Sequence, residues 1–154
     1  MNISKHVSLK EFIASDAATR YGIDNKMNSE QHQRAVELCE VIFEPMRLHF
    51  GRPIRVNSGF RSLAVNKRIG GSKTSQHMKG EALDLHIGSK EFHYIRENLP
   101  FDQLICEFPI VGEPSWVHVS YHKERNRGQV LIAIKSAGKT AYVPYAGNEH
   151  LVNN

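Results

Sequence analysis

Three residues in two short segments carry the side chains best suited to metal binding and catalysis. His77 and Asp84 lie in residues 75–84, and His118 lies in residues 115–120. Two imidazoles and one carboxylate form a three-ligand set for zinc, which leaves the fourth tetrahedral position open to water. An open position distinguishes a catalytic zinc site from a structural one, so these residues favour a zinc hydrolase.

A turn followed by a strand can bring the first two of these residues together. Gly80 permits a sharp turn between His77 and Asp84. Residues 82–87 alternate apolar and polar side chains, which is typical of a strand, so Asp84 and His86 share one face. His86 is therefore a rival ligand, although a surface or substrate-groove position is expected for it.

The rest of the chain predicts helices first and a sheet afterwards. Helices are expected from Ser8 and from Ser29, the second one kinked or ended by Pro45, and over 62–69 and 89–98. Residues 70–80 are expected to form a loop. Strands are expected at 54–57, 82–87, 103–108, 116–121 and 129–134. The expected fold class is α+β, a small and mainly antiparallel sheet packed with helices.

Length and composition indicate one globular domain over residues 1–154, with a frayed tail at about 148–154. The net charge of +4 suits an anionic partner, but no basic stripe points to nucleic acid. No stretch approaches the roughly 20 apolar residues that membrane insertion needs. The N-terminus lacks a signal-peptide core, so synthesis in the cytoplasm is expected. Cys39 and Cys106 lie in apolar stretches and are expected to be buried thiols.

The segments around the three residues resemble the zinc-binding motifs of the LAS-type peptidases. This family of bacteria and phages contains D-alanyl-D-alanine carboxypeptidases and L-alanyl-D-glutamate endopeptidases. Its pattern of Ser-x-His, six residues, Asp and a distant His is matched by Ser75, His77, Asp84 and His118. The segment Ser58-Gly59-Phe60-Arg61 is similar to the family's Ser-Gly-x-Arg. The resemblance, over about residues 4–134, implies a hedgehog/DD-peptidase-like fold and a Zn²⁺ cofactor held by His77, Asp84 and His118.

The general base is the point where the chain departs from the family pattern. Well-known members carry Asp or Glu three residues before the last histidine ligand, where this chain has Ser115. Glu107 is favoured as the base because it ends a strand expected to pair with that of His118, and a strand fixes geometry. Glu113, in the connecting loop, is the alternative, and Glu81 is a weaker third candidate.

Four residues are expected to bind the substrate. Arg61 can hold a peptide carboxylate with two hydrogen bonds or steady a developing oxyanion, as the matching family arginine does. Ser75 can bind the substrate backbone, and Gln76 and Asn66 are expected to line the groove.

The resemblance implies a zinc metallopeptidase that hydrolyses an amide bond in the peptidoglycan stem peptide, of D,D-carboxypeptidase or L,D-endopeptidase type. The sequence around Glu107 and His118 is most similar to a phage-like branch. The expected setting is therefore a monomeric phage endolysin or virion component that acts at the bacterial cell wall. The alternative is a non-hydrolytic zinc module, as hedgehog domains are, or a structural part of a phage particle.

Overall fold

The structure is a computed structural model that describes residues 1–146, and the tail expected at 148–154 lies outside them. Its helices are α1 (Leu9–Ile13), α2 (Asp16–Tyr21), α3 (Ser29–Leu38), η1 (Cys39–Phe43), α4 (Glu44–Phe50), α5 (Leu63–Arg68), η2 (Gln76–Lys79) and α6 (Ser89–Asn98). Its strands are β1 (Asn2–Ser4), β2 (Val7–Ser8), β3 (Arg55–Ser58), β4 (Ala82–His86), β5 (Gln103–Glu107), β6 (Trp116–Ser120), β7 (Gln129–Ser136) and β8 (Lys139–Pro144).

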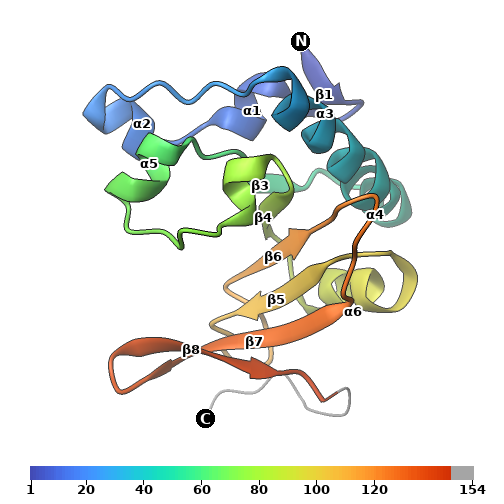
Figure 1. Cartoon of the computed structure of the whole chain (residues 1–154). Coiled ribbons are helices and arrows are strands. Elements are labelled where there is room, and N and C mark those ends of the chain that lie inside the picture. The colour runs from blue at the N-terminus through green and yellow to red at the C-terminus, as the bar shows by residue number, and fades with distance from the viewer. Residues whose placement is uncertain (147–154) are drawn as a thin grey trace.

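The larger sheet has six strands in the order β3-β4-β6-β5-β7-β8 (Figure 1). All neighbouring pairs are antiparallel except β5 with β7, which run parallel. Helices α1 to α4 precede this sheet in the chain, α5 and η2 lie between β3 and β4, and α6 lies between β4 and β5. The predicted α+β class with a mainly antiparallel sheet is confirmed.

The two faces of this sheet have opposite chemistry. One face is apolar and packs on α3, η1, α4 and α6 to form the core, which includes Leu38, Ile42, Phe43, Leu83, Leu85, Phe92, Leu104, Val117 and Val119. Because side chains alternate along a strand, the residues between these apolar ones face the other way. That opposite face carries Asp84, Glu107 and His118.

Local sequence signals explain the helix ends near the core. The Ser8 side chain accepts a hydrogen bond from the Glu11 N–H, and the Glu11 carboxylate accepts one from the Ser8 N–H, so a capping box opens the helix expected from Ser8. Pro45 does not end the second long helix, which continues to Phe50. Because proline has no N–H to donate, the chain passes through the π-helical turn η1 just before it.

Several elements differ from the sequence-based expectation. Helix α2, the β1–β2 hairpin and strand β8 were not predicted, and the expected loop 70–80 contains the short 3₁₀ helix η2. Ser89 is the first residue of α6, and Gly88 precedes it as the cap. Both cysteines are buried free thiols, as expected. In the part of the chain described, no helix is both long and apolar enough to cross a membrane.

Candidate active site

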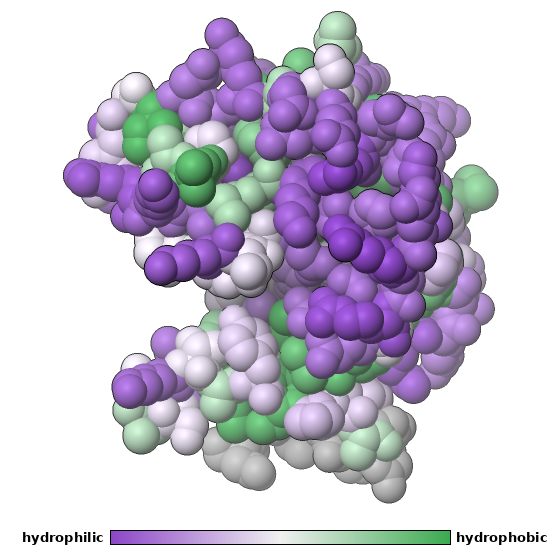
Figure 2. Space-filling model, in the orientation of Figure 1, coloured by the Kyte–Doolittle hydropathy of each residue, from purple (hydrophilic) through white to green (hydrophobic). Residues whose placement is uncertain are grey.

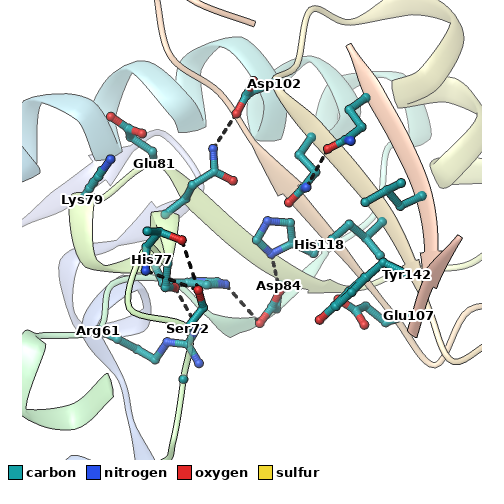
Figure 3. A pocket seen from close by; sticks show the side chains of 18 of the residues that line it. Arg61, Ser72, His77, Lys79, Glu81, Asp84, Asp102, Glu107, His118 and Tyr142 are labelled. Atoms are coloured by element: carbon teal, nitrogen blue, oxygen red, sulfur yellow. Dashed lines mark hydrogen bonds and ion pairs between the residues drawn. The ribbon is translucent and has the colours of Figure 1, made fainter. Parts of the chain in front are cut away.

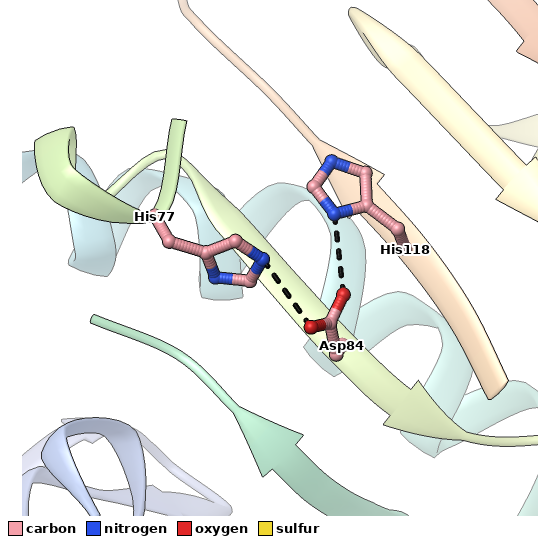
Figure 4. Close-up of side chains that lie close together, drawn as sticks. All are labelled: His77, Asp84 and His118. Carbon is pink, nitrogen blue, oxygen red and sulfur yellow. Dashed lines mark hydrogen bonds and ion pairs between the residues drawn. The ribbon is translucent and has the colours of Figure 1, made fainter. Parts of the chain in front are cut away.

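The structure brings His77, Asp84 and His118 to one point on the polar face of the sheet (Figure 4). Asp84 and His118 are cross-strand neighbours on β4 and β6, with His118 Nδ1 3.2 Å from Asp84 Oδ1. His77 arrives from η2, with its Nε2 3.4 Å from Asp84 Oδ2. One ligand atom from each residue lies within 4.8 Å of the other two.

The segment 58–61 fixes the orientation of His77. The His77 Nδ1–H donates to the Gly59 carbonyl at 2.6 Å, so Nε2 is left as the nitrogen that faces Asp84. The Arg61 N–H in turn donates to the His77 carbonyl at 3.1 Å. A backbone carbonyl behind a histidine is the usual support for a metal ligand.

Gly80 makes the turn that leads from His77 to Asp84. Its φ is +77°, and a Cβ there would collide with the carbonyl oxygen of Gln31 in α3. Only glycine meets both demands without strain. The sharp turn predicted at Gly80 is therefore present, and it is pressed against a helix of the core.

The donor set and its surroundings fit a zinc ion. Burial acts to raise the pKa of Asp84, but the nearby His77 and His118 rings outweigh it and hold that pKa well below its ordinary value. The carboxylate is thus ionised, as a metal ligand must be. Two nitrogens and one oxygen are a set that zinc accepts with a fourth position open. These three residues form a site that can hold Zn²⁺.

His86, the rival ligand, does not join this group. It lies at the exposed end of β4, opposite Arg55 of the edge strand β3. Among the described residues, the cluster of possible metal ligands contains only His77, Asp84 and His118.

Glu107 lies beside this cluster on the same face. It pairs with Trp116 across β5 and β6, and Ile105 pairs with His118, so Glu107 and His118 are diagonal neighbours. Glu107 is only 7% exposed, and burial raises its pKa to about 7, with a lowering contribution from His118 and a raising one from Asp84. The hairpin expected between their strands is present.

The other two carboxylates have different surroundings. Glu113 points away from the site, because its oxygens accept hydrogen bonds from the N–H and hydroxyl of Ser89 at the start of α6, both at 2.8 Å. Glu81 is 2% exposed and lines the pocket, where it pairs with Arg34 at 3.5 Å and with His122 at 3.7 Å.

Three of the four expected substrate-binding residues line one pocket of about 930 Å³ around the cluster (Figure 3). Arg61 donates from Nη2 to the Ser75 hydroxyl at 3.2 Å, while its buried Nε has no hydrogen-bond partner among the described residues. Gln76 donates to Asp102 at 2.6 Å. Asn66 differs from the expectation, since it does not line the pocket: it is buried, and its amide donates to the Ser72 carbonyl and holds the loop.

The sequence reasoning missed two groups in this pocket. Asp102 accepts hydrogen bonds from the Arg127 guanidinium, which lowers the pKa of Asp102 to about 2, and from Gln76, so it links the β6–β7 loop to η2. Tyr142 comes from β8, a strand that was not predicted. The glycine at Gly138, which follows the apolar run of β7 as a turn signal, is the feature that could have revealed it.

Comparison with known proteins agrees with this geometry. Residues 5–120 match the model of the family described as Peptidase M15. A curated relative, the zinc D-Ala-D-Ala carboxypeptidase of Streptomyces albus G, is 51% identical over 41 residues, which are 27% of this chain and 16% of that protein. The chain thus covers only a small part of that relative's length. Because the family match spans most of the chain and includes every residue of the cluster, the chain belongs to the Peptidase M15 family.

Proposed function

We propose that this protein is a zinc-dependent peptidase that hydrolyses an amide bond in the peptidoglycan stem peptide, with His77, Asp84 and His118 as the metal ligands. The observation that carries the proposal is the buried carboxylate of Glu107 beside a three-ligand cluster, at the floor of an open pocket. A non-hydrolytic zinc module has no need for a buried carboxylate with a pKa of about 7 at that place.

The chain's own residues supply the proton transfer in this proposal. Zinc, when bound, supplies Lewis acidity that polarises the scissile carbonyl and makes water more acidic. Glu107 accepts the proton of the attacking water and returns it to the departing amine. A pKa near 7 suits both steps, because the group can take up and release a proton at neutral pH.

Arg61 is the proposed anchor for a substrate carboxylate. Burial lowers the pKa of its guanidinium, the Asp84 charge opposes this, and an arginine remains protonated in either case. Among the described residues its guanidinium makes one side-chain hydrogen bond, from Nη2 to Ser75, so N–H donors remain at Nη1 and Nη2 for a ligand. Stem peptides are rich in carboxylates, and Lys79 and Arg125 at the same pocket add positive charge.

The resemblance around Glu107 and His118 supports a phage-like setting, in which one monomeric catalytic domain acts on the cell wall as an endolysin or virion component. The curated relative is named for D-Ala-D-Ala carboxypeptidase activity, which supports the carboxypeptidase type. An L,D-endopeptidase would use the same residues on a different bond of the peptide.

The test is fragment analysis on purified wall and on defined stem peptides. The zinc-loaded protein is expected to release fragments whose masses identify the bond, and a chelator should stop the release. His77→Ala should lose both metal and activity, whereas His86→Ala, which changes an exposed histidine on the same strand as Asp84, should retain both. Zinc-loaded protein that binds wall without cleaving it would support the non-hydrolytic alternative. Stoichiometric zinc in the His77 variant would refute the ligand assignment.

A further inference from the structure

The β7–β8 hairpin forms one wall of the pocket and lies beyond the residues matched by the family model, which end at 120. Its two-residue turn, Ala137-Gly138, has φ values of +51° and +77°, as in the tight turns that match strand twist. In Figure 1 the hairpin projects from the end of the sheet, and Figure 2 shows the surface hollowed between it and the lobe that carries α5 and the loop after it. The hairpin is therefore placed to contact whatever occupies the hollow.

Strand register directs Tyr142 of this hairpin toward the proposed base. Tyr142 pairs with Ala133, Ala133 with Glu107, and Glu107 with Trp116, so these four residues form one row across β8, β7, β5 and β6 on the polar face. The residue between Tyr142 and Glu107 is a buried alanine, which leaves room for the phenol ring to lean over it. Figure 3 shows the Tyr142 ring lying beside Glu107 and pointing toward Asp84.

The Tyr142 hydroxyl has donor capacity for a ligand. The side chain is 54% exposed, and its hydroxyl makes no hydrogen bond with any residue in 1–146. Burial of the ring, and then the charges of Glu107 and Asp84, raise the pKa of this phenol. It is thus protonated at neutral pH, and a protonated phenol can donate one hydrogen bond.

The charges around Tyr142 select the kind of group it can bind. The carboxylate of Glu107 lies on its side of the pocket, so the ionised form of Glu107 disfavours an anionic group of a ligand there, whereas the charge of Asp84 would be offset by the zinc ion that it would hold. Arg61 lines the same pocket together with Ser75 and η2, on the other side of the cluster in Figure 3, and attracts such a group. A neutral amide carbonyl is the acceptor that suits the phenol, and the carboxylate of the same ligand suits the guanidinium.

We propose that Tyr142 is a substrate-binding residue: its hydroxyl donates to a backbone carbonyl of the stem peptide and its ring packs against the peptide, while Arg61 holds a carboxylate of that peptide. This inference rests on the proposed peptidase function and extends it, because it sets the direction in which the peptide lies across the pocket. It also assigns a binding role to a segment outside the matched family region.

The test compares Tyr142→Phe and Tyr142→Ala with wild type on one defined stem peptide at equal zinc content. Loss of one hydrogen bond to a neutral acceptor corresponds to roughly a 2- to 10-fold change. Tyr142→Phe should therefore raise KM by about that factor with little change in kcat, and Tyr142→Ala should raise it further. The matched control is Val143→Ala, the next residue of β8, whose side chain faces the other side of the hairpin and should leave KM unchanged.

A second readout does not depend on turnover. Calorimetric titration with the same peptide can be done on the Glu107→Gln variant with and without Tyr142→Phe. Adding Tyr142→Phe should raise Kd by a similar factor and leave Tm and zinc content unchanged. If wild type is active and Tyr142→Phe changes neither KM nor Kd, this inference is wrong while the proposed function stands. Wild type that is zinc-loaded but cleaves no stem peptide would overturn the proposed function, and this inference with it.

Discussion

Ser115 fixes the strand end that carries Glu107. Ser115, at the position expected for an acid, instead closes the β5–β6 connection: its N–H donates to the Glu107 carbonyl at 2.9 Å and its hydroxyl to the Phe108 carbonyl at 2.7 Å. These bonds hold Glu107 at the strand end next to the metal cluster. Glu107, on the strand next to that of His118, is the carboxylate that we propose acts in place of the expected acid.

Glu107→Gln and Glu113→Gln separate the two candidate bases. The first should keep zinc and fold, because the amide is nearly isosteric, but should lower kcat by about 10²–10⁴-fold through lost proton transfer. The second should keep most activity, because Glu113 is exposed and bonded to Ser89. Steady-state kinetics at equal zinc content measure both, and an inactive Glu113 variant beside an active Glu107 variant would reverse the assignment.

The pH profile gives the same assignment a second check. Only the ionised carboxylate accepts a proton, and burial raises the pKa of Glu107 to about 7. The kcat/KM of wild type should therefore fall as the pH drops through about 7 and rise above it. Residual activity of Glu107→Gln should lack this acid limb. An unchanged limb in that variant would show that another group titrates.

Arg61→Lys tests whether geometry or charge matters at the anchor. Lysine keeps the charge but loses the planar pair of donors, one of which contacts Ser75. We expect kcat/KM to fall about 10- to 100-fold, which corresponds to loss of a charge-assisted hydrogen bond of roughly 1.5–3 kcal/mol. Kinetics on a defined stem peptide measure the change, and a normal value would mean that Arg61 is not the anchor.

Gly80 is the point at which one turn places two metal ligands. Gly80→Ala should lower stability by more than the roughly 1–2 kcal/mol of a left-handed backbone, because the new methyl would collide with Gln31. Zinc affinity should drop at least about 10-fold as the turn moves. Gly51→Ala is the matched control, with φ +63° and no atom within 4 Å of the added methyl. Denaturant titration measures the free energy of unfolding of both variants, and zinc titration measures their zinc affinity. Equal effects in the two variants would show that backbone strain at positive φ, and not the collision with Gln31, causes the loss.

Elements with strong periodic patterns were predictable, and short or polar ones were not. Alternation around Leu83 and Val117 reveals β4 and β6, because the strands bury one face in the core. Strand β8 lacks that signal: apart from the partly buried Ala141, its residues are exposed, and its turn places Ala137, an unusual turn residue, at positive φ. The wall that carries Tyr142 was therefore missed, although the ligand-bearing strands were found.

Across the whole molecule, one sheet has the hydrophobic core on one face and the candidate active site on the other. The sequence predicted the fold class and the pairing that brings Glu107 near His118 from local patterns, and it predicted the ligand cluster from the motifs shared with the family. It did not reveal the contacts between distant segments, such as the bonds of Asp102 with Gln76 and Arg127. Such contacts depend on how loops fold over the sheet, which no local periodicity encodes.

Metal binding should stabilise the entire fold, because the three ligands tie η2 to β4 and β6. A ligand present at 100 times its Kd stabilises by about 2.7 kcal/mol, which for a chain of this size raises Tm by roughly 5–10 °C. Calorimetry of wild type with zinc and with chelator should show this difference. His77→Ala should show almost none, whereas His86→Ala should match wild type, since His86 is exposed and outside the cluster. If zinc still raised the Tm of the His77 variant but not that of the His86 variant, His86 and not His77 would be the metal ligand.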